Sequence, residues 1–395
     1  MPDSSALYIH VPYCKRKCNY CDFYSVTELD SKKRYFDALN KEISLYSNKP
    51  PFALDTINTI YLGGGTPSLL APEEALLLLN HLKWNFHITG RVEVSFEANP
   101  GTVLQTNLYS FLKAGFNRIT IGVQSFHDGE LAVLTRIHNG EEAINAVRLA
   151  RKAGFENIGI DLIFGIPGQT PASWRESLQR AVDLRPHHIS MYGLTIEPHT
   201  PLGLAIKSRQ LSRCDEELER DMYLKGIEVL ESAGYEHYEI SNLALQGYRS
   251  RHNQKYWNGN PYLGLGPAAH SFNGIQRWWN CANVEQYCQY LDEDLLPFEK
   301  KEQLSIEQKC QELILLGLRR KEGIDLQQWS QVASGDLLTS AEPVIKELGG
   351  LDTRTLPFKN SKHNRLLTVL HKRLCLTRQG LLLYDTVCEK LAQVI

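Results

Sequence analysis

This 395-residue sequence lacks a surplus of charge of one sign, a long apolar run and an even number of cysteines. Its formal net charge is −2, so it has no basic excess for binding phosphates, and nucleic-acid binding is not expected. Its longest apolar runs, such as LLLY, fall far short of the ~20 residues that span a bilayer. No signal peptide is visible, because no charged segment followed by an apolar one opens the sequence. We therefore expect a cytoplasmic protein without a transmembrane segment.

The nine cysteines do not indicate a disulfide framework, because their number is odd and a chain of this length does not need such crosslinks. Six of them have no metal-like spacing and are expected to be buried small apolar residues in a reducing compartment. These six are Cys214, Cys281, Cys288, Cys310, Cys375 and Cys388. The other three fall within eight residues near the start of the chain and need a different explanation.

Strand-like and helix-like segments alternate between about residues 7 and 195. The six expected strands are residues 6–11, 57–64, 91–100, 117–125, 157–165 and 187–195. Alternation of this kind predicts parallel strands joined by right-handed crossovers. Six units are too few for a closed eight-unit barrel, so the pattern leaves two α/β folds open: a doubly wound sheet and a partial barrel.

The regular alternation ends near residue 242 and divides the chain into three predicted parts. Residues 1–240 hold the alternating units. Residues 241–304 are rich in Gly, Pro, Asn and aromatic residues and are predicted to be a loop-rich connecting segment. Residues 305–395 begin with an amphipathic helical pattern and are predicted to form a smaller, α-rich C-terminal domain.

Cys14, Cys18 and Cys21 have the spacing C-x3-C-x2-C on a segment that leaves the first expected strand. A structural zinc site would need a fourth ligand, and His10 is the nearest one. A 4Fe–4S cluster held by three cysteines would instead leave one iron open to another molecule. Three unligated thiols are a third alternative, although clustered exposed thiols oxidise readily.

The cysteine spacing resembles the signature of the radical S-adenosylmethionine (SAM) superfamily. That resemblance implies a 4Fe–4S cluster on Cys14, Cys18 and Cys21, with the fourth iron chelated by the amino and carboxylate groups of SAM. Three basic residues of the same loop, at positions 15–17, are placed to offset the negative charge of such a cluster.

Further motifs, LYIHVPYC, GGGTPS, IGVQSF and DLIFGIPGQT, resemble the radical SAM branch that contains oxygen-independent coproporphyrinogen III oxidase and its heme-chaperone relatives. The resemblance covers nearly the whole chain and implies a partial (β/α)6 barrel. It also implies a set of SAM-binding residues: Tyr8, Tyr20, Gly64, Gly65, Thr66, Glu97, Gln124, Arg136 and Asp161.

Two departures separate this sequence from the oxidase. The oxidase has a further cysteine two residues after the third, where this chain has Phe23, and it has a longer extension before the cysteines. The heme-chaperone group shares both differences. The segment RHNQKYW also matches the HNxxYW motif typical of the chaperones, which implies that His252 binds heme. A neutral imidazole is a common ligand of heme iron.

These observations predict a heme chaperone that binds heme, a 4Fe–4S cluster and SAM, and passes heme to an acceptor protein that the sequence does not name. The alternative enzyme function is coproporphyrinogen III oxidase, which would decarboxylate two propionates by radical chemistry. A zinc-stabilised interaction protein is the third alternative. Peripheral membrane association and a homodimer are both compatible with the sequence.

Overall fold

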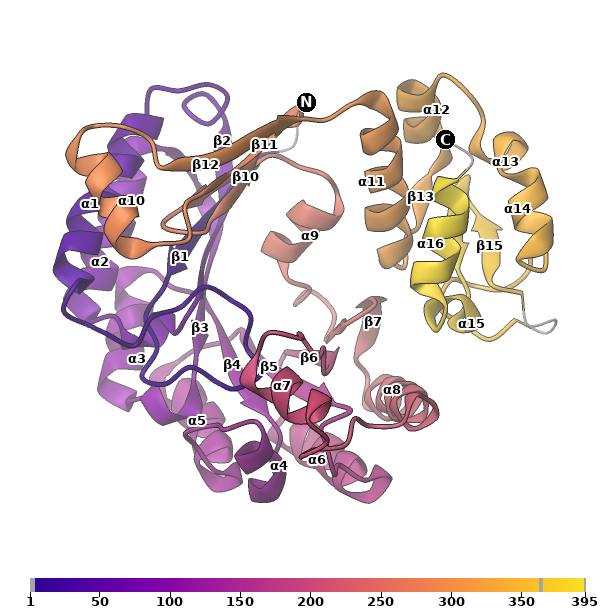
Figure 1. The fold of residues 1–395 in the computed structure, drawn as a ribbon, viewed down its shortest axis with the longest axis horizontal. Helices are drawn as coiled ribbons and strands as arrows, with labels where there is room; N and C mark the ends of the chain where they lie inside the picture. The colour runs from indigo at the N-terminus through magenta and orange to yellow at the C-terminus, as the bar shows by residue number, and fades with distance from the viewer. Residues whose placement is uncertain (1–3, 362–364, 394–395) are drawn as a thin grey trace.

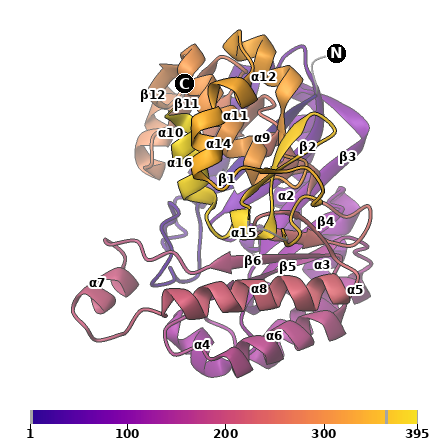
Figure 2. The ribbon, with the colours of Figure 1, turned by 90° about the vertical axis from the view of Figure 1, so that its right-hand side faces the viewer.

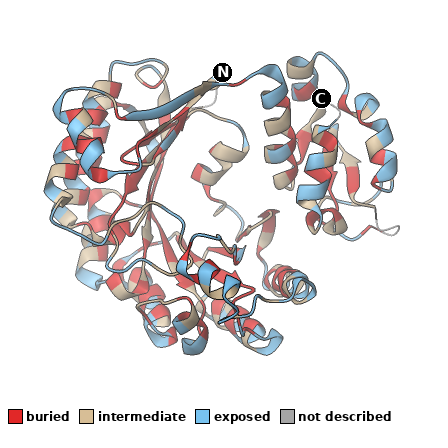
Figure 3. Cartoon of the chain, viewed as in Figure 1, coloured by how far each residue is buried: buried red, intermediate tan, exposed pale blue. Residues whose placement is uncertain are grey.

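A computed structural model describes residues 4–361 and 365–393, and Figure 1 shows its course. Six parallel strands lie side by side in chain order and form a strongly curved sheet, as predicted for a partial barrel. They are β1 (Ser5–Val11), β2 (Thr56–Gly64), β3 (His87–Ala98), β4 (Arg118–Gln124), β5 (Ile158–Phe164) and β6 (His188–Gly193). Most of their residues are buried on both faces (Figure 3), which explains their nearly continuous apolar sequence.

Helices of this part cover the outer face of the sheet (Figure 1), except the short helix after β6 (Pro201–Lys207), which stands away from it (Figure 2). They are α1 (Lys32–Tyr46), α2 (Pro72–Asn85), α3 (Gln105–Ala114), α4 (Asp128–Val133), α5 (Gly140–Ala153), α6 (Pro171–Leu184), α7 (Pro201–Lys207) and α8 (Glu216–Ser232). Figure 2 shows α8 and α6 lying along the same side of β5 and β6. The carboxyl ends of the strands are thereby left to the loops, where ligand sites of βα folds are found.

The segment predicted to be loop-rich differs from that prediction, because it extends the sheet at both edges and carries two helices. Its elements are β8 (Asn242–Ala244), α9 (Arg251–Trp257), β9 (Tyr262–Leu265), β10 (His270–Phe272), β11 (Gln276–Asn280), α10 (Val284–Asp292) and β12 (Phe298–Gln303). Strand β7 (Glu236–Glu239) lies just before this segment and pairs with β8. The strand order is β12-β11-β10-β9-β1-β2-β3-β4-β5-β6-β8-β7. The strands escaped the sequence pattern because they are short and contain tight-packing glycines: a Cβ on Gly264 would lie 2.1 Å from the carbonyl oxygen of His270.

The outer edge of the sheet is tied to α1 by one buried carboxylate, Glu42. Glu42 accepts hydrogen bonds from the backbone N–H of Gly266 (2.8 Å), from Asn280 Nδ2 (2.7 Å) and from the Tyr287 hydroxyl (2.6 Å). A buried carboxylate is tolerated only when such donors satisfy it. This one residue therefore joins α1 to the loop after β9, to β11 and to α10.

The C-terminal domain is a separate layer with its own four-stranded sheet, which the sequence did not predict. Its strands are β13 (Ile324–Asp325), β14 (Leu351–Asp352), β15 (Leu367–Leu370) and β16 (Arg373–Leu376), in the order β13-β16-β15-β14. Its helices, consistent with a helix-rich domain, are α11 (Ile306–Arg319), α12 (Leu326–Ala333), α13 (Leu337–Ser340), α14 (Glu342–Glu347), α15 (Arg378–Leu381) and α16 (Tyr384–Ala392).

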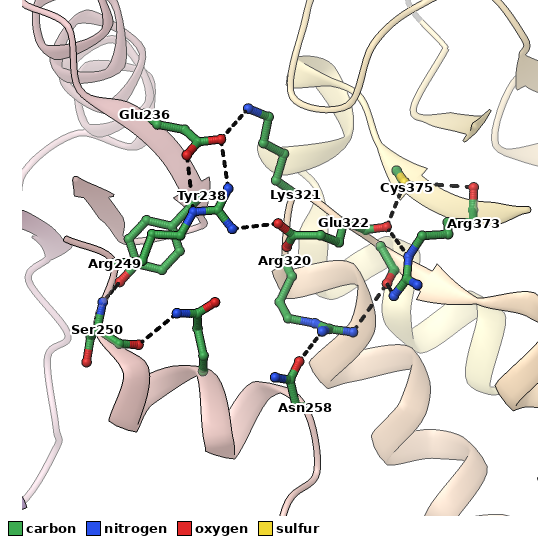
Figure 4. Close-up of polar contacts among 12 residues, drawn as sticks. Glu236, Tyr238, Arg249, Ser250, Asn258, Arg320, Lys321, Glu322, Arg373 and Cys375 are labelled. Atoms are coloured by element: carbon green, nitrogen blue, oxygen red, sulfur yellow. Dashed lines mark hydrogen bonds and ion pairs between the residues drawn. The ribbon is translucent and has the colours of Figure 1, made fainter. Parts of the chain in front are cut away.

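An ion-pair network joins the C-terminal domain to the end of the barrel (Figure 4). Arg249 pairs with Glu236 (2.7 Å) and with Glu322 (2.6 Å), and Lys321 pairs with the same Glu236 (3.0 Å). Helix α9, which carries the HNxxYW motif, lies between the inner side of the curved sheet and α11 (Figure 1). The motif therefore sits between the two domains rather than in an exposed loop.

Candidate cluster and SAM site

The three N-terminal cysteines lie on one loop that leaves the carboxyl end of β1. Two backbone hydrogen bonds close the base of this loop, from Cys14 N to the carbonyl of Val26 (2.9 Å) and from Val26 N to the carbonyl of Pro12 (2.7 Å). Cys14, Cys18 and Cys21 are partly buried free thiols that line one cavity of about 620 Å³. The loop therefore gathers all three sulfur atoms at one place over the strand ends.

Polar groups from other strands contact these thiols. Thr66 Oγ1 lies 3.4 Å from Cys14 Sγ, and Arg136 Nη1 donates to Cys18 Sγ over 3.3 Å. Burial raises the pKa of Cys21, and the nearby thiols of Cys18 and Cys14 raise it further. Cations favour thiolates, so Arg136 is placed to stabilise the deprotonated sulfurs that a cluster needs.

His10 does not offer the fourth ligand that a zinc site would need. Within residues 4–361 and 365–393, no three His, Cys, Asp or Glu side chains converge on a position for one metal ion. His10 is not free as a zinc ligand, because Nε2 lies 2.8 Å from the carbonyl oxygen of Tyr24 and Nδ1 lies 3.2 Å from the Tyr8 hydroxyl. In a 4Fe–4S cluster each thiolate binds a different iron, so the sulfurs need not converge.

The glycine-rich turn after β2 packs directly against the start of the cysteine loop. Gly65 N donates to the carbonyl of Val11 (2.8 Å), and Thr66 N donates to that of Tyr13 (2.8 Å). Gly64 has φ +104°, and a Cβ there would lie 2.6 Å from the His10 ring. Position 64 therefore needs glycine because of its positive φ and the nearby His10 ring, independently of any ligand.

Two carboxylates face the cavity from the carboxyl halves of β3 and β5. Glu97 Oε1 accepts a hydrogen bond from the Tyr61 hydroxyl (2.9 Å). Asp161 Oδ1 is buried and has no hydrogen-bond partner in the described part of the chain. Burial raises the pKa of Glu97 to about 7 and that of Asp161 to about 6. A buried, unsatisfied oxygen beside a cavity is a suitable partner for a ligand N–H or O–H group.

Gln124, at the end of β4, and Arg136, in the loop after α4, line the cavity on its β4 side. Gln124 has φ +65°, a left-handed conformation rare outside glycine, at an irregularity in the pairing of β4 with β5. Backbone strain of this kind is typical of functional sites. Arg136 Nη2 donates to the carbonyl of Gly122 (2.8 Å), whereas Nε is buried without a hydrogen-bond partner among the described residues.

The cavity brings together eight of the nine residues that the resemblance implied for SAM: Tyr20, Gly64, Gly65, Thr66, Glu97, Gln124, Arg136 and Asp161. Tyr8, the ninth, is not among the residues that line it. Its ring instead stacks on Tyr61, with centroids 6.4 Å apart. Of the basic loop residues, Arg16 and Lys17 line the cavity, whereas Lys15 Nζ donates to the carbonyl of Gly101 (3.2 Å).

Sequence reasoning missed several cavity residues, including Asn99, Thr120, Tyr192 and Glu197. Tyr192 is 39% exposed and lies near the carboxyl end of β6, the strand end where ligand contacts are expected. The position of Tyr192 near the end of a predicted strand is the sequence signal that could have identified it as a cavity residue. Phe23 also lines the cavity and is 70% exposed, so an aromatic ring stands where the oxidase pattern has a cysteine.

His252 lies outside this cavity, at the start of α9, and is only 1% exposed. Its Nδ1 lies 3.0 Å from Thr59 Oγ1, and its Nε2 lies 2.8 Å from the Tyr256 hydroxyl. Burial, together with the charge of Lys255, lowers the pKa of His252 to about 3, so the ring is neutral. A neutral imidazole has one donor and one acceptor nitrogen, and both are engaged.

Comparison with known proteins gives two family matches. The Radical SAM superfamily matches residues 8–181, and the HemN C-terminal domain matches residues 304–383. The heme chaperone HemW of Mycobacterium tuberculosis is 35% identical over 324 residues, which cover 81% of this chain and 83% of that protein. The heme chaperone HemW of Synechocystis is 34% identical over 398 residues, covering 96% and 94% of the two chains.

A solved structure has the same fold over the full length. Coproporphyrinogen III oxidase (HemN) from Escherichia coli, described as a radical SAM enzyme, superposes with a TM-score of 0.82. The match covers 100% of this chain and 92% of that one, at 24% sequence identity. This similarity establishes the fold of the chain, including that of its C-terminal domain.

Proposed function

The chain belongs to the family of the heme chaperone HemW, and on that premise we propose that it binds heme and delivers it to an acceptor protein. The observation that carries the proposal is the extent of the match: a relative named as a heme chaperone is 34% identical over 96% of this chain. Phe23 supports it, because the oxidase pattern has a cysteine at that position and this chain does not.

Membership of the radical SAM superfamily implies a 4Fe–4S cluster and SAM, and the cavity fits both. Cys14, Cys18 and Cys21 would hold the cluster, with Arg136 beside one of the sulfurs. When bound, this pair supplies one-electron chemistry at the SAM sulfonium. The protein contributes a binding wall of two carboxylates and a glycine turn, which attracts a cationic ligand and orients it over the cysteine loop.

Glu97 and Asp161 are the residues we expect to recognise the positive charges of SAM. Both face the cavity, and the Asp161 oxygen without a partner has an unused capacity to accept a hydrogen bond. An ionised carboxylate in a partly buried site gains more from a cation than it would in water. We propose that the eight cavity residues and Tyr8 bind SAM, and this proposal rests on the family resemblance.

Ligation of heme iron by the His252 imidazole does not fit the structure. Both ring nitrogens are engaged, and the side chain is buried, so no nitrogen is offered to iron. Ligation would require the ring to leave Thr59 or Tyr256. We therefore derive no step of heme transfer through His252, and its role as a heme ligand stays a prediction.

The partners and location of the protein are part of the proposal. No helix in the described part of the chain has the length and apolarity needed to cross a bilayer. All nine cysteines are free thiols, which suits the reducing cytoplasm where we propose that the protein acts. The proposal includes an acceptor protein for heme. It is compatible with a peripheral contact with a membrane and with a homodimer.

Spectroscopy of the anaerobically purified full chain tests the function. We expect the broad absorbance of an iron–sulfur cluster, and a separate Soret band that saturates as heme is added. In parallel, the protein is offered coproporphyrinogen III, SAM and a reductant. Saturable heme binding without formation of a vinyl product supports the chaperone. Formation of the vinyl product at an enzyme-like rate, without heme binding, would replace it with the oxidase.

A further inference from the structure

A column of three aromatic rings stands behind the cavity carboxylate Glu97. The Tyr61 ring stacks with Tyr8, with centroids 6.4 Å apart and planes at 21°, and with His252, with centroids 5.0 Å apart and planes at 25°. The hydroxyl of the central ring, Tyr61, donates to Glu97 Oε1 over 2.9 Å. His252 is thus connected to the SAM site through one ring and one hydrogen bond, without lining the cavity itself.

The His252 end of this column is firmly held. The backbone N–H of His252 donates to Glu93 Oε1 (3.0 Å), while its ring nitrogens contact Thr59 and Tyr256. Thr59 lies two residues before Tyr61 on β2. Two contacts therefore fix the plane of the imidazole against Tyr61, and a third holds the backbone of the same residue. A buried polar ring satisfied at every atom is a rigid support.

Glu97 needs such a support because few contacts fix its carboxylate. Its partners within the protein are the Tyr61 hydroxyl and the backbone N–H of Gly64. If the Tyr61 ring tilted, the carboxylate would lose one of two donors and its orientation toward the cavity would change. A flat ring stacked with two neighbours is restrained from tilting, whereas a ring that has lost one neighbour has room to move.

We propose that His252 is a positioning residue of the SAM site: it holds Tyr61 so that the Tyr61 hydroxyl fixes Glu97 for its cationic ligand. This inference rests on the proposed binding of SAM, and it gives the first residue of the HNxxYW motif a task other than ligating iron. His252 on α9 and Tyr61 on β2 are distant in sequence, and the fold brings these two elements into contact beside Glu97 on β3.

Two variants and their combination test the relay. Tyr61→Phe removes only the hydroxyl, and His252→Leu removes the stacked ring and its anchors while keeping much of the volume. The full chain is reconstituted anaerobically with its cluster, and the Kd for SAM is measured by calorimetry. Loss of one hydrogen bond to a charged group predicts weakening of about tenfold or more for each single variant. The double variant should be no weaker than the stronger single variant, because both act through the same hydroxyl.

Two further variants separate positioning from loss of folding. His252→Phe keeps a flat ring on Tyr61 and should restore most of the SAM affinity that His252→Leu loses. His237→Leu is the matched control: His237 is also 1% exposed, its Nε2 lies 3.2 Å from the carbonyl oxygen of Ile240, and it has no contact with the ring column. It should leave the Kd for SAM unchanged. Iron content in every variant reports whether the cluster loop is intact.

Heme titration of the same samples keeps the relay apart from the chaperone function. Weakened SAM binding with unchanged heme affinity in His252→Leu supports the relay. Parental affinity for SAM in His252→Leu, or additive losses in the double variant, overturns it. Loss of heme binding with parental SAM affinity would assign His252 to heme instead. A parent protein that binds SAM but not heme would defeat the chaperone proposal alone.

Discussion

The guanidinium of Arg319 lies over the ring of Trp257, 4.2 Å from its centroid. Trp257 is the last residue of the HNxxYW motif on α9, and Arg319 is the last residue of α11 in the C-terminal domain. Arg319 Nε is also 2.9 Å from Glu239 Oε2, a carboxylate with no exposed surface. One arginine thus joins the C-terminal domain to the motif helix and to the barrel edge.

Replacing Arg319 with Met should lower the free energy of unfolding by about 3 kcal/mol, because Glu239 would remain buried without its cation. Chemical denaturation followed by circular dichroism measures the change. Arg148→Met is the matched control, since Arg148 is exposed and lies 3.8 Å from Glu141 on the surface. It should change stability by less than about 0.5 kcal/mol. Equal effects of the two variants would contradict the role of the buried pair.

Replacing Cys18 with Ala should abolish the charge-transfer absorbance of the cluster and most of the bound iron. Three protein ligands leave no spare thiolate to compensate. Cys214→Ala is the control, because Cys214 is also a partly buried free thiol but is not among the residues lining the cavity. Anaerobic absorbance and iron analysis report both variants. Full cluster content in Cys18→Ala would rule out the assignment.

Arg136→Met should make the reduction potential of the cluster more negative. The Arg136 guanidinium contacts Cys18 Sγ, and removing a partly buried positive charge disfavours the added electron. Lys15 lies in the cysteine loop but is exposed to solvent, so its charge is screened. Lys15→Met should therefore shift the reduction potential less than Arg136→Met. A redox titration followed by electron paramagnetic resonance gives both values. An unchanged potential in Arg136→Met would show that this cation does not tune the site.

Affinity for SAM should rise with pH through about 6 and about 7, the raised pKa values of Asp161 and Glu97. Below these values the buried carboxyls are protonated and attract a cation less, so the association constant falls by up to about tenfold per pH unit for each group that must ionise. Calorimetry across this range measures the slope. S-adenosylhomocysteine, which lacks the sulfonium charge, should show a weaker dependence. The same slope for both ligands would refute the electrostatic argument.

The barrel strands and the cysteine loop could be predicted from the sequence because their signals are local, whereas the SAM residues of the cavity were expected only from the family resemblance. Alternating apolar strands and helices indicate parallel βα units, and the cysteine spacing lies within one loop. The strands β9–β12 were not predicted, since each is short and their pairing depends on close backbone approach at residues such as Gly264. Their order in the sheet is a property of long-range packing.

The surroundings of single residues were the least predictable part of the site. The sequence suggests that Gly64 is needed for ligand approach, whereas the structure also places the His10 ring where its side chain would lie. The contact between Thr59 and His252 spans 193 residues, so no local pattern contains it. Tyr61 carried no motif signal, and only the structure shows its hydrogen bond to Glu97 and its stacking with Tyr8 and His252.

The carboxylate of Glu42 has a consequence for the order of events on the ribosome. Its donors Gly266, Asn280 and Tyr287 follow it by 224, 238 and 245 residues. At ordinary rates of translation this separation corresponds to roughly 10 to 50 seconds. During that interval β1 has β2 beside it but lacks β9, and Glu42 has none of these three partners. The strand that leads into the cysteine loop therefore gains its second neighbour, β9, only late in synthesis.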